Sequence, residues 1–367
     1  MKFRVEREVL AEALGAAARV ASTRNNAMPA LSGVKMSVQG DTLTLTCTDN
    51  DLSIEFEIPV GGQRDGVMVA SAKLMSDIVR SVDEGKVTVE ATGEEVNVSA
   101  DRSQFNVPTF VVTDFPQVTK ASAPPVKISA PAFAEALRQV VRAASNDLQR
   151  LPLTGVLLAH EGDGLRLVAT DSYRLAVKTM PNTFVLGDGQ PVVIPSRALG
   201  ELQRLLGTGD EATLYLAADR ATFAVGAATL STSLLAVEFP KYQQLIAPSY
   251  PNKLTTAREP LLEAIRRCRV VARDNTPLRL EMSATSLRLE VVTPDLSNAS
   301  ASVTLDAAHD GTEMMIGFNP DFFAQGVEAV SGDEVTIETS DPHKPAVIRG
   351  VGNNDYLYLL MPQRLNG

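Results

Sequence analysis

Leu153-Thr154-Gly155-Val156 repeats Leu31-Ser32-Gly33-Val34 after 122 residues, and Thr170-Asp171 follows Thr48-Asp49 at the same distance. Three weaker matches keep this order at 123 or 124 residues: 11–14 with 134–137, 114–116 with 238–240, and 209–214 with 332–337. A long internal period is the sequence signature of a tandem array. The chain is therefore predicted to contain three copies of one unit of about 122 residues.

Length and linkers agree with three copies. The chain has 367 residues, and about 100–200 residues make one domain. Two proline-containing segments, 120–125 and 247–252, fall where one copy would end and the next begin. We expect domains at 1–122, 123–249 and 250–367.

Each copy is predicted to open with an amphipathic helix. In the second copy, Phe133, Leu137 and Val140 recur at helical spacing, Ser129 is a possible N-cap, and Pro131 suits the first turn. Strands with period-two alternation follow at 42–47, 165–169 and 287–291, and further strands at 86–90 and 334–338. Second helices are predicted to begin near Ser71, Ser196 and Asn319. The pattern predicts an α+β class of mostly antiparallel strands, with two helices in each copy.

Charge is unevenly distributed along the chain. The total of 34 Lys and Arg against 44 Asp and Glu gives a net charge of -10, which argues against tight binding of nucleic acid. Segments 2–24, 127–150 and 258–273, which hold the opening helices, nevertheless carry net charges of +2, +2 and +3. Equivalent helices gathered on one side would form a basic surface that touches phosphates without reading bases.

The cysteines and the N-terminal segment indicate a cytosolic protein. Cys47 and Cys268 are the two cysteines, and no CxxC pair exists, so a zinc finger or a disulfide framework is not expected. The first residues mix acidic and basic side chains and lack the apolar run of a signal peptide. No apolar run approaches 18 residues, so no membrane span is expected.

No known catalytic motif is present. The sequence lacks a phosphate-binding P-loop, a GxGxxG turn and a GxSxG elbow, and His160, His309 and His343 lack metal-ligand spacing. We expect no catalytic residue, no metal and no cofactor. Asp49 and Asp171 recur in two copies, which favours a turn-capping role. A hydrolase that uses these two carboxylates with a metal is the alternative from another class of protein.

Three motifs resemble those of a known family. They are Ala169-Thr170-Asp171-Ser172-Tyr173-Arg174-Leu175-Ala176-Val177, then Phe239-Pro240-Lys241-Tyr242, and the ending Leu359-Leu360-Met361-Pro362-Gln363-Arg364-Leu365. Together with three α+β copies over the whole chain, they resemble the bacterial sliding clamps, the beta subunits of DNA polymerase III.

The resemblance implies a protein that is not itself an enzyme, although the polymerase holoenzyme is a nucleotidyltransferase. It implies three tandem DNA-clamp domains that close as a head-to-tail homodimer ring, with sheets outside and helices inside, around double-stranded DNA of any sequence. The implied partners are the catalytic subunit of DNA polymerase III, the clamp loader, and other polymerases and repair proteins that carry clamp-binding peptides. The implied place is the bacterial cytoplasm, at the nucleoid and without a membrane.

The resemblance also implies three sets of residues. The peptide-binding groove would comprise Leu153, Thr170, Ser172, Tyr173, Arg174, Leu175, Pro240, Gln244, Leu245, Leu359, Leu360, Met361, Pro362, Gln363, Arg364 and Leu365. The DNA-facing residues would be Arg24, Lys73, Gln149, Arg150, Arg197 and Arg204. The dimer interface would contain Phe105, Val270 and Val271.

This chain departs from the family pattern at several of these places. Leu151-Pro152 stands where aromatic residues can occur, Gln244 replaces a frequent arginine, and Tyr173 replaces a frequent histidine. Asn366-Gly367 extends past the usual terminal leucine. The alternative within the same fold is an accessory clamp copy that gives tolerance to a clamp-binding antibiotic, and the genomic neighbourhood would separate it from the replicative clamp.

Overall fold

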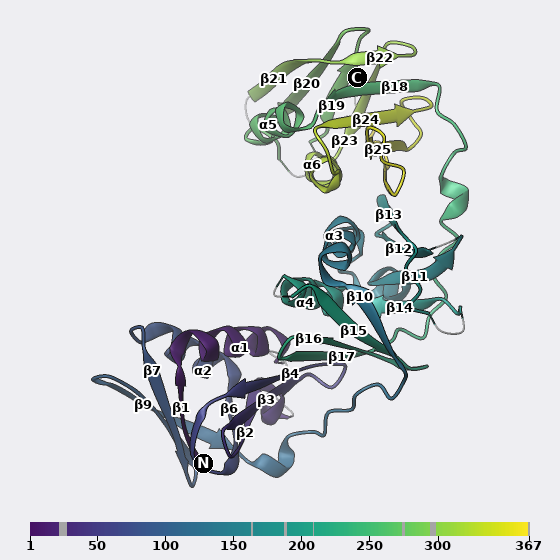
Figure 1. Ribbon diagram of the computed structural model, residues 1–367. Coiled ribbons are helices and arrows are strands. Elements are labelled where there is room, and N and C mark those ends of the chain that lie inside the picture. The colour runs from purple at the N-terminus through teal and green to yellow at the C-terminus, as the bar shows by residue number, and fades with distance from the viewer. Residues whose placement is uncertain are drawn as a thin grey trace. The chain divides into compact units, whose positions relative to one another are not determined.

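The computed structural model describes residues 1–21, 28–162, 164–186, 189–207, 209–273, 276–293 and 299–365. Figure 1 labels the helices and strands of the chain. The chain forms two compact units. Unit 1 comprises Met1–Ala134 and Arg197–Leu234, and unit 2 comprises Glu135–Ser196 and Leu235–Gly367.

Six α-helices occur among these residues, two in each predicted copy. The first helix of each copy is α1 (Arg7–Val20), α3 (Ala130–Val140) and α5 (Arg258–Arg269). The second is α2 (Ala72–Ser81), α4 (Ser196–Leu206) and α6 (Pro320–Ala329).

Two of the predicted helix starts are confirmed by their capping bonds. The Asn319 side chain accepts hydrogen bonds from the backbone N–H groups of Asp321 and Phe322, at 2.9 and 3.1 Å. The Ser71 hydroxyl accepts one from Leu74, at 3.4 Å. Ser196 was predicted to be the N-cap of α4 but is the first residue of the helix, so α4 begins one residue earlier than predicted.

A short strand precedes the first helix of every copy, and these strands were not predicted. They are β1 (Lys2–Glu6), β10 (Pro125–Ser129) and β18 (Asn252–Ala257). In β1, the buried side chains of Phe3 and Val5 alternate with the exposed ones of Arg4 and Glu6. Five residues contain only about two periods of this alternation. A pattern that short is difficult to recognise next to the longer helical pattern that follows it.

Unit 1 contains one continuous sheet of 13 strands. Its order is β10-β15-β16-β17-β4-β3-β2-β6-β9-β8-β7-β1-β5, and every pairing is antiparallel. The first and second copies join where β4 pairs with β17. The remaining strands are β2 (Gly33–Gln39), β3 (Thr42–Thr48), β4 (Leu52–Pro59), β5 (Gly61–Arg64), β6 (Gly66–Ser71), β7 (Lys86–Thr92), β8 (Glu95–Ala100), β9 (Ser103–Phe110), β15 (Glu211–Leu216), β16 (Arg220–Val225) and β17 (Ala228–Ser233).

Unit 2 contains two antiparallel sheets. A nine-stranded sheet has the order β14-β11-β12-β13-β26-β25-β24-β18-β22, and a four-stranded sheet has the order β21-β20-β19-β23. The second and third copies join where β13 pairs with β26. These strands are β11 (Gly155–Glu161), β12 (Gly164–Thr170), β13 (Arg174–Pro181), β14 (Val192–Pro195), β19 (Leu278–Met282), β20 (Ser286–Thr293), β21 (Ala299–Asp306), β22 (Ala308–Asp310), β23 (Met314–Phe318), β24 (Glu334–Thr339), β25 (Ala346–Gly350) and β26 (Tyr356–Leu360).

The strands of the second copy are divided between the two units. Strands β15 to β17 extend the sheet of the first copy, whereas β11 to β14 extend the sheet of the third copy. The compact units therefore cut through the second copy. The antiparallel α+β class is confirmed, and the domain limits after 122 and after 249 stay a prediction.

Both cysteines are packed in the interior, as predicted. Cys47 in β3 and Cys268 in α5 are fully buried and form no disulfide. Burial raises the pKa of each thiol, since a thiolate is poorly solvated in an apolar interior. Neither thiol is placed to act as a nucleophile near neutral pH.

The caps of α6 and α2 provide a matched test of local helix stability. Replacing Asn319 with Ala removes an acceptor for two backbone N–H groups and should lower the free energy of unfolding by about 1 kcal/mol. The Ser71→Ala variant loses a single, longer hydrogen bond and should lose less. Chemical denaturation of both variants, followed by circular dichroism, measures the difference. A larger loss for Ser71→Ala would contradict the assignment of the stronger cap.

Candidate functional site

The recurring Thr-Asp pair builds a tight loop between β12 and β13 in unit 2. The Oδ1 atom of Asp171 accepts hydrogen bonds from the backbone N–H groups of Tyr173 and Arg174, at 2.9 and 3.0 Å. The Thr170 hydroxyl donates to the Arg174 carbonyl, at 2.7 Å. Ser172 adopts the left-handed backbone conformation, with φ of 80°.

The same loop occurs between β3 and β4 in unit 1. Asp49 Oδ1 accepts hydrogen bonds from Asp51 and Leu52, at 3.1 and 2.8 Å, and the Thr48 hydroxyl donates to the Leu52 carbonyl, at 3.0 Å. Asn50 takes the left-handed conformation, with φ of 85°. Both carboxylates therefore cap turns, as predicted.

The carboxylate hydrolase considered above is not supported by these contacts. Besides capping a turn, Asp49 forms an ion pair with Arg197, and Asp171 forms one with Arg174. Within the described ranges, no group of three or more His, Cys, Asp and Glu side chains could hold a metal ion.

An apolar row of side chains crosses the strands at the junction in unit 2. Leu175 in β13 is opposite Leu359 in β26, which is opposite Val347 in β25. All three side chains are almost fully buried. They belong to one cluster with Val168, Val177, Tyr242 and Leu357, covered by the partly buried Leu157, Phe239, Ile246 and Tyr250.

The equivalent row at the junction in unit 1 is polar. Ser53 in β4 is opposite Ser231 in β17, which is opposite Thr222 in β16. The Thr222 and Ser231 hydroxyls are 2.8 Å apart. Ser231 donates to the Thr119 carbonyl, and Thr222 accepts a hydrogen bond from the Ala121 N–H. The linker between the copies therefore covers this junction with hydrogen bonds, whereas an apolar cluster underlies the other.

Exposed apolar side chains adjoin the apolar junction. Tyr173, Leu245 and Met361 are 60%, 51% and 41% exposed. The Met361 N–H donates to the Tyr173 carbonyl, at 2.9 Å, which joins the segment after β26 to the Thr-Asp loop.

The rest of this segment is also docked on unit 2. The Gln363 N–H donates to the Gly317 carbonyl, at 2.8 Å. The Leu365 side chain lies so close to Gly317 that a Cβ atom there would be 2.5 Å from its Cδ2. Residues 361–365 thus contact both the second and the third copies.

The predicted groove residues all lie in unit 2 and fall into three groups. Leu153, Thr170, Arg174, Leu175, Leu359 and Leu360 are buried. Ser172, Tyr173, Pro240, Gln244, Leu245, Met361 and Arg364 are exposed. Pro362, Gln363 and Leu365 are half-buried. We call the buried group and its cluster the floor, and the exposed group the rim. Peptide binding by these residues stays a prediction.

Several floor residues were not predicted. Phe239 and Tyr242 pack edge to face, with ring centroids 6.5 Å apart, and the Tyr242 hydroxyl donates to Glu161, at 3.4 Å. The Phe-Pro-Lys-Tyr motif pointed to both residues, although only Pro240 was assigned from it. Val347 and Leu357 had no motif that could have indicated them.

The predicted DNA-facing residues are exposed but mostly ion-paired. Lys73, Arg197 and Arg204 lie in unit 1, and Gln149 and Arg150 lie in unit 2. Arg204 pairs with Glu201, and Arg150 Nε is 3.1 Å from Asp147 Oδ2. Arg24 lies outside the described residues, as does the Asn366-Gly367 extension.

Several arginines of the opening helices and of the segments after them are also ion-paired, and the basic surface itself stays a prediction. In unit 1, Arg19 Nε is 2.8 Å from Glu201. In unit 2, Arg138 binds Glu135 and Arg142 binds Glu328. Much of the positive charge counted along the sequence is used within the protein.

The predicted interface residues lie at two elements. Phe105 is half-buried in β9 of unit 1. Val270 and Val271 follow α5 in unit 2, where Val270 is 83% exposed and Val271 is half-buried.

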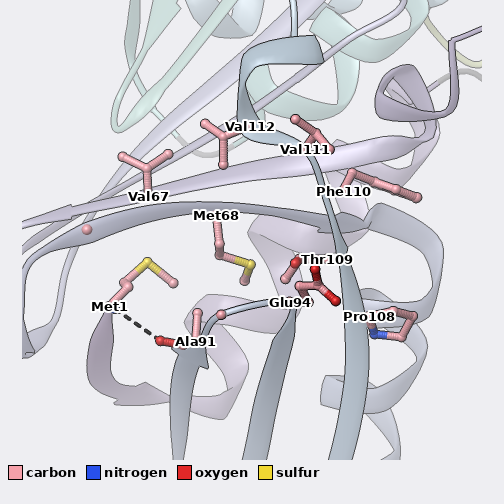
Figure 2. A pocket seen from close by; sticks show the side chains of 12 residues that line it. Met1, Val67, Met68, Ala91, Glu94, Pro108, Thr109, Phe110, Val111 and Val112 are labelled. Carbon is pink, nitrogen blue, oxygen red and sulfur yellow. Dashed lines mark hydrogen bonds between the residues drawn. The ribbon is translucent and has the colours of Figure 1, made fainter.

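A pocket of about 570 Å³ lies apart from all of these residues, in unit 1 (Figure 2). Its apolar lining comes from β6, from the end of β9 and from Met1, whose amino group donates to the Ala91 carbonyl at 3.2 Å. It shares no residue with the predicted groove. Among the described residues, no helix is long and apolar enough to cross a membrane.

Comparison with known proteins defines the class of this fold. Three models of DNA polymerase III beta subunit domains match in order: the N-terminal domain at residues 1–119, the central domain at 127–241 and the C-terminal domain at 243–364. The chain is 30% identical to the beta sliding clamp of Streptomyces coelicolor over the full length of both proteins. It is 35% identical to that of Micrococcus luteus over 83% of this chain and 98% of the relative.

A solved structure has the same fold over its whole length. The sliding clamp of Bartonella birtlesii, in a crystal structure with bound griselimycin, aligns over 100% of both chains with a TM-score of 0.91 and 28% identity. The fold is thus that of the three-domain DNA clamps. The chain belongs to the DNA polymerase III beta subunit family. It is a sliding clamp, a processivity subunit that is not itself catalytic, so the hydrolase alternative is wrong.

Two neighbouring side chains distinguish the floor from the rim. Leu359 is 2% exposed in the apolar cluster, so Leu359→Ala should lower the free energy of unfolding by about 2–5 kcal/mol. Met361 is 41% exposed, and Met361→Ala should change the free energy of unfolding by less than about 0.5 kcal/mol. Urea denaturation of both variants measures this contrast. Equal losses would show that the two residues do not occupy different environments.

Proposed function

We propose that two copies of this chain close head to tail as a ring around duplex DNA and tether DNA polymerase III for processive synthesis. Clamp loader, other polymerases and repair proteins would bind the same chain through short peptides. The protein would act in the bacterial cytoplasm, at the nucleoid. Tethering raises the effective concentration of the polymerase at the primer end without adding a catalytic group.

The observation that supports a ring is the repeated helix junction. In unit 1, the first helix of domain 1 contacts the second helix of domain 2: Arg197 of α4 donates to the Val20 carbonyl of α1, at 3.1 Å. In unit 2, the first helix of domain 2 contacts the second helix of domain 3: Arg138 of α3 donates to the Glu328 carbonyl of α6, at 2.9 Å. The first helix of domain 3 and the second helix of domain 1 remain for a junction with another copy.

The side chain at the end of the first helix supports the same assembly. Arg19 and Arg142 each lie seven residues after the glutamate of the Glu-Ala motif, Glu12 or Glu135. Both form ion pairs across an internal junction. Val270 occupies this position after Glu263 and is 83% exposed. An apolar side chain would suit a junction with α2 of a second copy, and a head-to-tail contact that closes after two copies makes a ring.

Retention on DNA would be topological. The net charge of -10 and the engaged arginines favour weak, salt-sensitive contact with phosphates. A clamp needs such weak contact, because it must slide along the duplex.

The ring is tested on circular DNA. After loading onto a nicked circular plasmid by a bacterial clamp loader with ATP, the protein should stay bound through gel filtration and dissociate when the plasmid is linearised. Val271→Glu is the matched control, because a charge buried at an apolar interface is strongly unfavourable. It should give folded monomers by light scattering and no retention. Dimers of this variant, or equal retention on linear DNA, would contradict the ring.

The groove is proposed to hold peptides with Leu and Phe anchors. An apolar floor with a few polar groups at its edge is typical of such sites. Of the two internal junctions, the one in unit 2 has the apolar cluster, and its rim carries the exposed Tyr173, Leu245 and Met361. Gln244 and Tyr173 would adjust which peptides bind.

Deletion of Met361 through Gly367 tests the groove separately from the ring. Strand β26 ends at Leu360, so the cut removes the docked segment and leaves the β13–β26 pairing intact. The truncated protein should stay a dimer and still be retained on circular DNA. Its affinity for a Leu- and Phe-containing polymerase peptide should fall by about 2 kcal/mol or more, roughly thirtyfold.

A second deletion provides the control. Removal of Asn366 and Gly367 alone should keep peptide affinity within about twofold of the full chain, because rim residues remain in place. Fluorescence anisotropy with a labelled peptide measures both variants. Full affinity after the longer deletion would show that the groove lies elsewhere.

A further inference from the structure

One buried guanidinium group occupies the centre of the junction in unit 2. The Arg174 side chain is 9% exposed, and its Nε donates to Asp171 Oδ2, at 2.9 Å. One terminal nitrogen donates to the amide oxygen of Gln325 in α6, and the other donates to the carbonyl of Arg142, which follows α3. The group therefore links the Thr-Asp loop, the end of the first helix of domain 2, and the second helix of domain 3.

Two further contacts hold this guanidinium in place. It stacks on the Phe322 ring, 4.2 Å from the centroid, and it lies 3.4 Å from the Tyr358 hydroxyl. That hydroxyl donates to the Phe322 carbonyl, at 2.9 Å. Each of the three nitrogens of the Arg174 guanidinium therefore has a partner inside the protein. Few donors remain that could meet a charged group from solution.

The junction in unit 1 contains a guanidinium with equivalent partners, supplied by a different residue. Arg197, at the start of α4, pairs with Asp49 Oδ2. It also donates to the carbonyls of Arg19 and Val20 at the end of α1, at 3.2 and 3.1 Å. Leu52 stands at the position that Arg174 occupies in the second copy.

The two arrangements solve the same physical problem. The carbonyls at the end of a helix lack partners within the helix and carry partial negative charge, and the carboxylate of the loop lies next to them. A guanidinium can bind both, because it presents five N–H donors in a planar fork. Lysine cannot replace it, since a single ammonium is a point charge on a flexible stem.

We infer that Arg174 is a positioning residue of the peptide-binding groove and does not contact the charge of the peptide. This inference rests on the proposed function of the groove. Arg174 fixes the Thr-Asp loop through Asp171, the loop presents the Tyr173 carbonyl, and that carbonyl holds the Met361 N–H. Two rim side chains, Tyr173 and Met361, thereby depend on one buried group. Arg197 links the loop to the end of the helix in the same way at the other junction, where the equivalent side-chain row is polar.

The inference is tested with Arg174→Lys, using Arg150→Lys as the matched control. Arg150 donates to the same loop, to the Asp171 carbonyl and the Ser172 hydroxyl, but it is exposed. Two synthetic peptides with the same Leu and Phe anchors are used, one with an acidic residue beside them and one with a neutral residue. The Arg174→Lys variant should bind both peptides about tenfold or more weakly, by the same factor at low and high salt. Arg150→Lys should stay within about twofold for the neutral peptide.

Hydrogen exchange separates positioning from general destabilisation. In Arg174→Lys, the amide protons of Tyr173, Arg174 and Met361 should exchange faster, while those of β11 and β12 keep the wild-type rate. A loss of affinity confined to the acidic peptide and abolished by salt would overturn the inference, because it would place the guanidinium against the peptide. Unchanged exchange at Met361 would also overturn it. If the wild-type chain binds neither peptide, the proposed groove fails, and the exchange measurement still tests the role of Arg174 in the loop.

A rescue experiment tests the equivalence of the two junctions. Arg197→Leu should speed hydrogen exchange of the Asp51 and Leu52 amide protons, because both N–H groups donate hydrogen bonds to Asp49. Adding Leu52→Arg to that variant supplies a guanidinium from the loop, as in the second copy, and should restore most of the protection. No restoration in a folded double variant would overturn the equivalence.

Discussion

Unpaired strand edges are the constraint on which the rest of this structure depends. A sheet edge exposes a row of backbone N–H and C=O groups that must be paired or protected. Each clamp domain satisfies an edge with its neighbour, through β4 with β17 in unit 1 and β13 with β26 in unit 2. These pairings set which side chains meet across each junction. The side-chain rows, the helix contacts and the two guanidinium groups all follow from that register.

Equivalent antiparallel strand pairings at the two junctions carry side chains of opposite polarity. Ser53, Ser231 and Thr222 bind the linker by hydrogen bonds, so that surface is covered by the chain itself. Leu175 and Leu359, in the equivalent places, instead support an apolar cluster with exposed apolar neighbours. A repeat can therefore keep its fold while one copy specialises for binding, because side-chain rows change without a change in strand pairing.

Local sequence predicted what local interactions determine. The helices, the five strand segments that were predicted and the Thr-Asp turns depend on neighbours within a few residues, and the period of about 122 residues can be read directly from the sequence. The use of arginines did not follow, because Arg19 meets Glu201 across 182 positions and no spacing rule connects them. Burial of Val347 and Leu357 likewise depends on the pairing of β25 and β26, and strand β1 was hidden by its shortness. The groove and DNA-facing residues came from the family resemblance, and the structure divided the first set into floor and rim.

The sharing of the second copy between two units has a consequence for biosynthesis. Leu52 in β4 pairs with Thr232 in β17, and Leu175 in β13 pairs with Leu359 in β26. The edges of β4 and β13 therefore stay unpaired until a strand about 180 residues further along the chain has been synthesised. At about 5–20 residues per second, a ribosome needs roughly ten to forty seconds to supply that partner. During this time a nascent chain carries an open apolar edge beside Leu175 that its own later segment must reach before another chain does. Slow translation or crowded polysomes would favour wrong partners, and chaperones that shield strand edges would be needed most during this interval.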